Sequence, residues 1–401
     1  MKEAVIVATA RTPVGRANKG SLVDVRPDDL CALIVRDVLS KVPALDPAEV
    51  EDLIVGCAQP AGEQGYNLGR VVSIIAGLPD VPGTTVNRYC ASSLQAIRMA
   101  AHAIKAGEGD AFVAAGVECV SRFHKGKSDG MEGTHNPLLA ESEARTAARA
   151  DGGAGTWTEQ GLPDVYIAMG QTAENVAEVE SVSREVQDEF AALSQQRAVA
   201  AQESGFFDGE ITPVELADGT VVARDDGPRP GTTADKLAAL KPVFRPDGSV
   251  TAGNACPLND GAAAVVVMSD ARAEALGITP LARIVSSAVS AIDPEIMGLG
   301  PVEASHRALR RAGITSDDVG VVEINEAFAA QVVPSARHLG VEWDRLNVNG
   351  GAIALGHPFG MTGARIMTTL LHTLADRGER YGLETMCIGG GQGMAMVVER
   401  L

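Results

Sequence analysis

The chain has 401 residues, which is too many for one compact core and indicates two or three packed units. Its formal net charge of −18 argues against nucleic acid or an anionic membrane as a partner, because both bind basic surfaces. No apolar run approaches the roughly 20 residues that span a bilayer, and the N-terminus lacks the basic start of a secretion signal, so we expect a cytoplasmic protein without a membrane span.

Strands and helices alternate along the chain, which predicts an α/β fold. After an apolar first strand within 1–10, the sequence predicts a helix over 28–40 and a strand over 52–56. A capping box of Asp46 and Glu49 lies at the junction between that helix and that strand.

The second half of the chain repeats this order. It predicts a helix over 302–311 and a strand over 321–324, with a capping box of Thr315 and Asp318 between them.

Both halves then continue in the same way, with a short strand, a turn, a helix and an apolar strand that contains glycine. These strands are predicted at 84–87 and 111–116 in the first half, and at 346–349 and 386–391 in the second. Four successive elements that correspond in order predict two duplicated βαβ-type halves, with a site at the turns where the halves meet.

The middle of the chain has a different character, with Gly-rich polar segments and helical patterns over 170–179 and 184–203. Long inserts of this kind often shape a substrate channel. We therefore expect an N-terminal core half at 1–120, an inserted loop domain covering the substrate channel at 121–250, and a C-terminal core half at 251–401.

Cys90 is the first candidate for chemistry. A strand is predicted to end near Asn87 and a helix to follow, which places Cys90 at a helix N-terminus, where free N–H groups favour a thiolate and can face an oxyanion. A buried structural cysteine explains the position equally well. The six cysteines form no CxxC pair, which argues against a zinc site or a disulfide framework.

Three residues of the second half are further candidates. His357 lies in a Gly-rich turn where it can accept a thiol proton, although a loop histidine is more often a plain surface residue. Cys387 precedes the turn at 389–391, whose N–H groups can bind an anion, but the GxxxxGK[ST] pattern of a phosphate loop is missing. Asn325 ends a strand and can orient a histidine or a water, or simply form a turn.

These four residues share one feature, because each falls just past a predicted strand of the duplicated core. Such strand ends gather in one crevice, and a cysteine, a histidine and a donor-rich turn are what nucleophilic acyl transfer requires. The sequence therefore predicts an enzyme that carries its acyl group on Cys90.

Long stretches around these residues resemble the thiolase family, which comprises acetyl-CoA acetyltransferases and 3-ketoacyl-CoA thiolases. The stretches are 86–96, 169–175, 251–254, 259–264, 325–328, 349–363 and 387–393. The resemblance implies the thiolase fold, in which the two halves form a layered αβαβα core.

The resemblance also implies roles. Cys90 would be the acylated nucleophile, and His357 would activate its thiol and, with a water held by Asn325, polarise the thioester oxygen of the second substrate. Cys387 would shuttle the α-proton, and the backbone N–H groups of Cys90 and Gly389 would form the oxyanion hole. The implied substrate-binding residues are Met169, Phe244, Ala252, Cys256 and Phe328.

The implied partners are CoA thioesters and further copies of the chain, in a homodimer or homotetramer. CoA would be a substrate rather than a cofactor, and no metal or redox cofactor is implied. We expect thiolytic cleavage of 3-ketoacyl-CoA, as in β-oxidation. A biosynthetic acetyltransferase that forms acetoacetyl-CoA and a non-catalytic, thiolase-like lipid-binding protein stay open as alternatives.

Two positions depart from the family pattern. Cys256 stands where the family often has a serine that contacts the pantetheine arm, and a thiol is a weaker hydrogen-bond partner. Ile167 and Ala168 precede Met169, where short-chain biosynthetic members often carry a histidine, so a smaller apolar lining is expected to admit longer or bulkier acyl groups. A ketoacyl synthase is disfavoured because Cys387 is present.

Overall fold

The computed structural model describes residues 2–129, 132–152 and 155–401. Within these ranges the strands of the main sheet are β1 (Ala4–Arg11), β2 (Gly15–Arg16), β3 (Asp52–Gly56), β4 (Gly83–Val86), β5 (Ala111–Cys119), β8 (Asn259–Ser269), β9 (Ala282–Ala291), β10 (Val321–Ile324), β11 (Tyr381–Ile388) and β12 (Gln392–Arg400). Their order across the sheet is β10-β11-β12-β9-β1-β8-β5-β3-β4, and β2 pairs with β8.

The sheet consists of two halves with the same pairing pattern. β3 is parallel to β4 and β5, and β10 is parallel to β11, while β8 and β12 return antiparallel beside β5 and β11. The halves join where β1 pairs with β9. The predicted repetition of the two halves is therefore confirmed.

The prediction of a strand at 346–349 is wrong, because these residues form no strand in the structure. Leu346 makes only a single parallel bridge to Val322. At the next residue, the side chain of Asn347 replaces the backbone ladder, because its Oδ1 accepts from the N–H of Ile324 and its Nδ2 donates to the carbonyl of Ile324. Asn347 also has φ +44°, a left-handed conformation that ends an extended strand.

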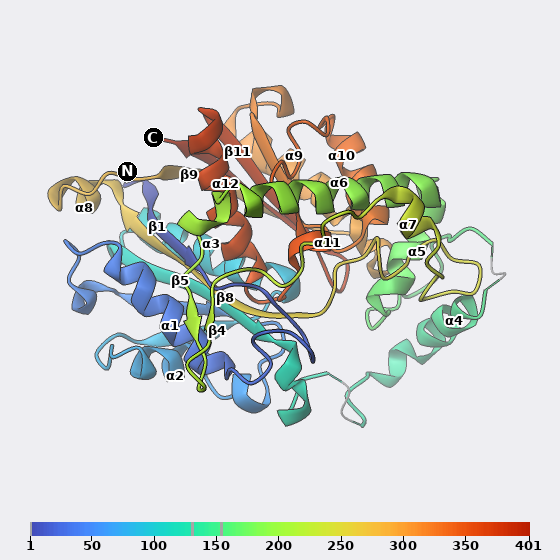
Figure 1. The fold of residues 1–401 in the computed structure, drawn as a ribbon, viewed down its shortest axis with the longest axis horizontal. Coiled ribbons are helices and arrows are strands. Elements are labelled where there is room, and N and C mark those ends of the chain that lie inside the picture. The colour runs from blue at the N-terminus through green and yellow to red at the C-terminus, as the bar shows by residue number, and fades with distance from the viewer. Residues whose placement is uncertain (1, 130–131, 153–154) are drawn as a thin grey trace.

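Helices cover both halves in layers. The helices of the core are α1 (Pro27–Ser40), α2 (Leu68–Ile75), α3 (Ser92–Ala106), α8 (Asp270–Ala275), α9 (Gly300–Ala312), α10 (Ala329–Leu339), α11 (Ala352–Leu355) and α12 (Thr362–Arg377). One apolar core lies between α1, α2 and the first half of the sheet, a second surrounds α3 and α12, and a third packs α9 and α10 against the second half. This is the expected αβαβα order, with α3 and α12 in the central layer (Figure 1).

The middle of the chain contributes α4 (Ala140–Ala150), α5 (Met169–Val179), α6 (Arg184–Glu203), α7 (Ala234–Ala238) and a small hairpin of β6 (Val214–Glu215) and β7 (Val221–Val222). α5 and α6 both pack on α10, and α4 lies at the outer edge of the molecule beside α5 (Figure 1). The predicted helices over 170–179 and 184–203 are thus confirmed to within one residue.

Short 3₁₀ turns link these elements, at Pro47–Glu49, Gly62–Gln64, Tyr89–Ala91, Val120–Lys125, Pro137–Leu139, Phe206–Gly209, Pro294–Leu299 and Ser316–Asp318. The capping box of Thr315 and Asp318 forms as predicted. The other is only half formed: Asp46 accepts from the N–H of Ala48, but the carboxylate of Glu49 pairs with Arg272 instead.

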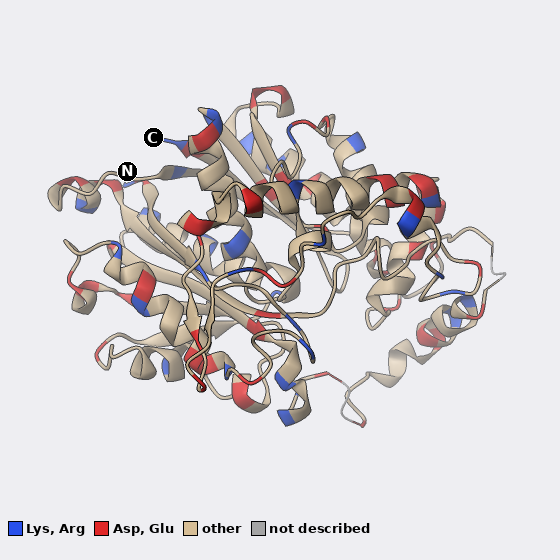
Figure 2. Ribbon diagram, viewed as in Figure 1, with Lys and Arg blue, Asp and Glu red and all other residues tan. Residues whose placement is uncertain are grey.

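Charged residues of both signs are interspersed over the outer helices and loops (Figure 2). Within the described part of the chain, no helix is long and apolar enough to cross a membrane.

Candidate active site

The turn after β4 positions Cys90 at the junction of the two halves. Cys90 lies in the 3₁₀ turn Tyr89–Ala91, two residues before α3 begins, and is half-buried. Ser92 closes this turn, since its Oγ accepts from the N–H of Arg88 and donates to the carbonyl of Tyr89. The predicted helix N-terminus is therefore a separate tight turn that presents Cys90 ahead of α3.

The residue before Cys90 has a strained backbone. Tyr89 has φ +45°, which is rare for a residue with a large side chain, and its N–H donates to Oδ1 of Asn87 at 2.8 Å. Arg88 ties this turn to the second half, because its guanidinium donates to Gln392 just past the Gly-rich turn at 389–391. One local hydrogen bond and one long-range contact thus hold the turn in a conformation that it would not adopt alone.

Two backbone N–H groups face the sulfur of Cys90. Burial raises the pKa of the Cys90 thiol to about 11, while hydrogen bonds from the backbone N–H groups of Gly389 and of Cys90 itself act in the opposite direction. Desolvation therefore outweighs the two donors, and the pKa of the Cys90 thiol lies above its ordinary value in this environment. The same donors lie where they can stabilise charge on the carbonyl oxygen of an acyl group bound to the Cys90 sulfur.

His357 is buried beside Asn325. Asn325 is the first residue after β10, and its Nδ2 lies 3.3 Å from Nε2 of His357. Nδ1 of His357 lies 2.6 Å from Oγ1 of Thr362, and this hydroxyl donates to the carbonyl of Pro358. This network assigns the ring proton to Nδ1 and leaves a lone pair on Nε2.

The histidine is neutral in this environment. Burial, and secondarily the charge of Arg365, lowers the pKa of His357 to about 3. Phe359 packs edge-on against the imidazole, with ring centroids 5.1 Å apart, and lines the same cavity as Cys90. The imidazole is therefore neutral, and its Nε2 can accept a proton from an attacking thiol.

Two further thiols approach Cys90. Burial raises the pKa of Cys387 well above its ordinary value, and the neighbouring Cys90 and Cys256 sulfurs add to that shift. Burial likewise raises the pKa of Cys256, with Cys90 as the next contributor. The three sulfurs thus lie within electrostatic range of one another, although they come from residues 90, 256 and 387.

Three details of placement differ from the sequence-based expectation. Cys387 is the penultimate residue of β11 rather than a residue past a strand. His357 follows the short helix α11, because the expected second-half strand is missing before it. The turn at 349–360 buries His357 completely, so it is not a surface histidine.

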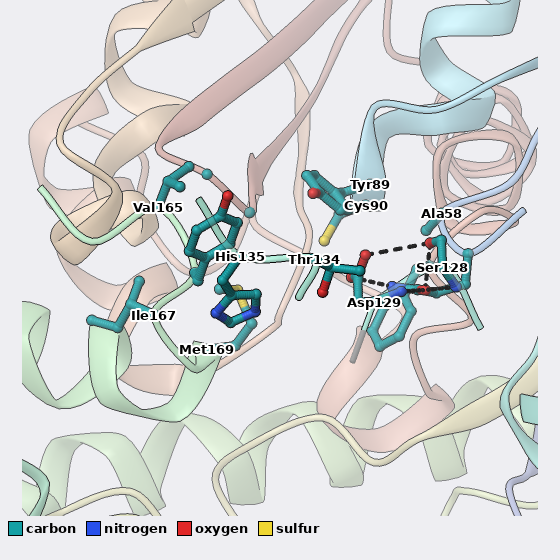
Figure 3. A pocket seen from close by; sticks show the side chains of 15 residues that line it. Ala58, Tyr89, Cys90, Ser128, Asp129, Thr134, His135, Val165, Ile167 and Met169 are labelled. Carbon is teal, nitrogen blue, oxygen red and sulfur yellow. Dashed lines mark hydrogen bonds between the residues drawn. The ribbon is translucent and has the colours of Figure 1, made fainter. Parts of the chain in front are cut away.

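One cavity of about 460 Å³ opens at Cys90 (Figure 3). Tyr89, Gly389 and Gly390 line it beside Cys90, and Met169 and Ile167 contribute an apolar wall. Of the predicted substrate-binding residues, Met169 is the one that lines this cavity.

A second cavity, of about 400 Å³, holds Phe244, Ala252 and Cys256 in its wall. Cys256 is placed there by the hydrogen bond from its N–H to the carbonyl of Ala327. The fifth residue, Phe328, lies in the apolar cluster with Cys387 and packs edge-on against Phe244, with centroids 6.2 Å apart. The five residues are thus divided among the cavity at Cys90, the second cavity and the apolar cluster that contains Cys387.

Arginines with no acidic partner line the second cavity. Burial lowers the pKa of Arg229, and the positive charge of Arg16 lowers it further, so the two guanidinium groups lie near each other. Neither side chain makes an ion pair with a carboxylate among the described residues. Two adjacent, uncompensated guanidinium groups favour an anionic ligand such as a phosphate.

Sequence reasoning missed one buried acid that connects the parts of the site. Glu118, at the end of β5, accepts from the N–H groups of Ala58 and Gly360 and from the side chain of Gln64. Burial raises the pKa of Glu118 and these hydrogen bonds oppose the shift. A lone acid inside the apolar strand pattern of 111–119 is the signal that could have found it.

Two family models match the chain: "Thiolase, N-terminal domain" over residues 4–271 and "Thiolase, C-terminal domain" over 278–400. The chain is 46% identical to "3-ketoacyl-CoA thiolase" of Bacillus subtilis (strain 168) and 47% identical to "3-oxoadipyl-CoA/3-oxo-5,6-dehydrosuberyl-CoA thiolase" of Escherichia coli (strain K12), with all of both chains covered in each case. Among solved structures it is similar to the Bacillus anthracis acetyl-CoA acetyltransferase, with a TM-score of 0.87, 38% identity, and 100% of this chain and 99% of the other covered.

Proposed function

This chain belongs to the thiolase family, and we propose that it is a 3-ketoacyl-CoA thiolase, an acetyl-CoA C-acyltransferase that works through a Cys90 acyl-enzyme. The observation that carries the proposal is the position of Cys90, whose sulfur faces two backbone N–H groups, opens on an acyl-sized cavity and neighbours two other thiols.

In the first half-reaction, the thiol of Cys90 passes its proton to Nε2 of His357 and the sulfur attacks the 3-keto carbon. The C2–C3 bond breaks, the shortened acyl group stays on the sulfur, and the enolate of acetyl-CoA leaves. Cys387 gives its thiol proton to C2 of that enolate. Oδ1 of Asn325 is buried and accepts from no described residue, so it can hold a water that, with His357, faces the enolate oxygen.

In the second half-reaction, the thiolate of Cys387 takes the proton of CoA, and the CoA sulfur attacks the acyl-enzyme. The backbone N–H groups of Cys90 and Gly389 stabilise the oxyanion that forms. The Cys90 sulfur leaves and recovers its proton from His357. Both thiols and the imidazole return to their starting protonation states, so the cycle balances.

CoA is proposed to enter through the second cavity. Arg16 and Arg229 would face its phosphates, while Phe244, Ala252 and Cys256 would contact the pantetheine arm. Met169 and Phe328 would complete the substrate-binding set around the sulfurs. The weak hydrogen-bonding capacity of the Cys256 thiol favours an apolar contact there.

Condensation of two acetyl-CoA molecules is the second candidate, favoured by the similarity to the acetyl-CoA acetyltransferase structure. The cavity of about 460 Å³ beside Cys90 is far larger than a two-carbon acetyl group and favours cleavage of longer substrates.

We also retain as proposals the three-part division at residues 120 and 250, a cytoplasmic location and a homo-oligomer. A reduced compartment suits a site that depends on free thiols. The edge strand β4 and the exposed Tyr66 and Ile74 beside it provide a surface for a second copy.

The proposal is tested by mass spectrometry after incubation with acetyl-CoA, together with a thiolysis assay. The native protein should gain one acetyl group on the peptide that contains Cys90, and Cys90→Ser should lose turnover by at least about 10³-fold. A Cys256→Ser control should still be acetylated at Cys90. A native protein that gains no acetyl group would instead support the lipid-binding alternative.

A further inference from the structure

The cavity beside Cys90 is apolar on one side and polar on the other. Val165, Ile167 and Met169 form the apolar side, while Ser128, Asp129 and Thr134 are grouped on the polar side (Figure 3). The Cys90 sulfur points into the space between them (Figure 3). An acyl chain bound to Cys90 must therefore run past both walls.

The charge of the polar wall is negative. Asp129 is the one carboxylate among the described residues that line the cavity, and none of those residues is lysine or arginine. His135 also lines the cavity, but its Nδ1 lies 2.8 Å from Oε2 of Glu143, so a proton on this ring would be offset by that carboxylate. Its ring is stacked on Tyr166 at 4.0 Å.

Hydrogen bonds hold Asp129 in this position. Nε2 of Gln59 donates to Oδ2 of Asp129 at 2.5 Å, and the hydroxyl of Ser128 donates to Oδ1 at 3.3 Å. Oε1 of Gln59 in turn accepts from the backbone N–H groups of Ser128 and Asp129. All these donors are neutral, so they orient the carboxylate without cancelling its charge.

The charge of Asp129 reaches the catalytic turn. Burial raises the pKa of the Tyr89 phenol, and Asp129 is the next contributor, ahead of Tyr166 and Cys90. Tyr89 lines the same cavity as Asp129, so the field of Asp129 acts on a side chain beside the acyl path.

We propose that Asp129 determines acyl specificity in this enzyme, favouring 3-ketoacyl-CoA substrates whose far end is uncharged and disfavouring those that end in a carboxylate. This inference rests on the proposed thiolase function and sharpens its substrate class. It separates the chain from the Escherichia coli 3-oxoadipyl-CoA/3-oxo-5,6-dehydrosuberyl-CoA thiolase, despite 47% identity.

The size of the effect follows from electrostatics. A substrate carboxylate brought within several ångströms of Asp129 is repelled by it, because no cation lines the cavity among the described residues. With an effective dielectric constant typical of a protein surface, this repulsion lowers kcat/KM for that substrate by about ten-fold. An uncharged chain of the same length avoids this penalty and gains contact with the apolar wall.

The test compares thiolysis of 3-oxohexanoyl-CoA and 3-oxoadipyl-CoA, which have equal carbon number and differ in the terminal methyl or carboxylate. The native enzyme should prefer 3-oxohexanoyl-CoA by about ten-fold or more in kcat/KM. Asp129→Asn is isosteric and should raise kcat/KM for 3-oxoadipyl-CoA by about ten-fold, with little change for the neutral substrate. Asp317→Asn, an exposed site outside the cavity, should leave the ratio unchanged.

A native preference for 3-oxoadipyl-CoA, or a ratio that Asp129→Asn does not move, would overturn the inference while leaving the thiolase function intact. Failure to cleave either substrate would overturn the proposed function itself, and the inference with it.

Discussion

Glu118 connects three parts of the active site through one buried carboxylate, and its replacement tests that connection. Oε2 accepts from the N–H groups of Ala58 and Gly360, and Oε1 accepts from the N–H of Gln59 and from Nε2 of Gln64. Ala58 and Gln59 line the cavity at Cys90, and Gly360 belongs to the turn that carries His357. All four partners are donors.

Glu118→Gln keeps the shape of the side chain but turns one acceptor oxygen into an amide donor. With the amide at the Oε2 position, the N–H groups of Ala58 and Gly360 lose their acceptor. At the Oε1 position only the N–H of Gln59 does, because Nε2 of Gln64 also donates to the carbonyl of Gln59. Each unsatisfied buried group costs about 1–3 kcal/mol, and because the side chain will adopt the less costly orientation, the variant should be less stable by about 1–3 kcal/mol. We also expect kcat to fall, because the turn at Gly360 that positions His357 loses its anchor.

The measurement is urea unfolding at pH 7, followed by circular dichroism, together with kcat for thiolysis below the unfolding transition. Glu323→Gln is the matched control: Glu323 is also buried in a strand, but its Oε1 has no partner among the described residues. Burial raises the pKa of Glu323 to about 8, so an amide there replaces an acid that is mostly protonated at pH 7. The reasoning fails if both variants lose the same stability, or if Glu118→Gln is as stable as the native protein.

Three further outcomes are expected. Cys387→Ala should still acquire an acetyl group on Cys90, as seen by mass spectrometry, but should lose both condensation and thiolysis in a steady-state assay. Loss of acetylation would contradict the separate roles of the two thiols. Arg229→Gln should raise KM for CoA by about ten-fold and weaken its dependence on ionic strength, measured at several salt concentrations; an unchanged KM would remove the CoA phosphates from the second cavity. The pKa of Glu323 in the folded protein, about 8, exceeds its ordinary value of 4.5. Its contribution to stability is therefore complete below pH 4.5 and is lost as pH rises through 8, at up to about 1.4 kcal/mol per pH unit. Glu323→Gln should flatten this part of the stability profile in urea titrations from pH 5 to 9, and an unaltered slope would exclude the raised pKa of Glu323.

The order of the elements was predictable from the sequence because it depends on local patterns. Periodic apolar residues marked α1, α6 and α9 to within two residues, and the short strands β3 and β10 were predicted with correct bounds. The repeated order of these elements indicated two similar halves. Local patterns misled at 346–349, where the side chain of Asn347 replaces a strand ladder, a role that adjacent residues do not reveal. They also misled at the strand predicted at 386–391, since β11 ends at Ile388, and at the capping box of Asp46 and Glu49, which is only half formed.

The sequence by itself also pointed to Cys90, His357 and Cys387 as candidate reactive groups, since residue type and glycine context carry that information. Their protonation states were decided only by the tertiary structure. Position in a turn suggested an acidic thiol, but burial raises the pKa of Cys90 to about 11 and lowers that of His357 to about 3. Desolvation depends on every segment packed around a group, and those segments come from distant parts of the chain.

The same reason explains why Glu118 and Asp129 escaped notice in the sequence. A carboxylate is ordinary in a sequence, and its role depends on which donors or ligands face it. Glu118 meets Gly360 across 242 positions of chain, and Asp129 meets Gln59 across 70. The sequence determined which chemical groups the protein carries and in what order they occur, whereas the folded structure decided which of them face one another and with what charge.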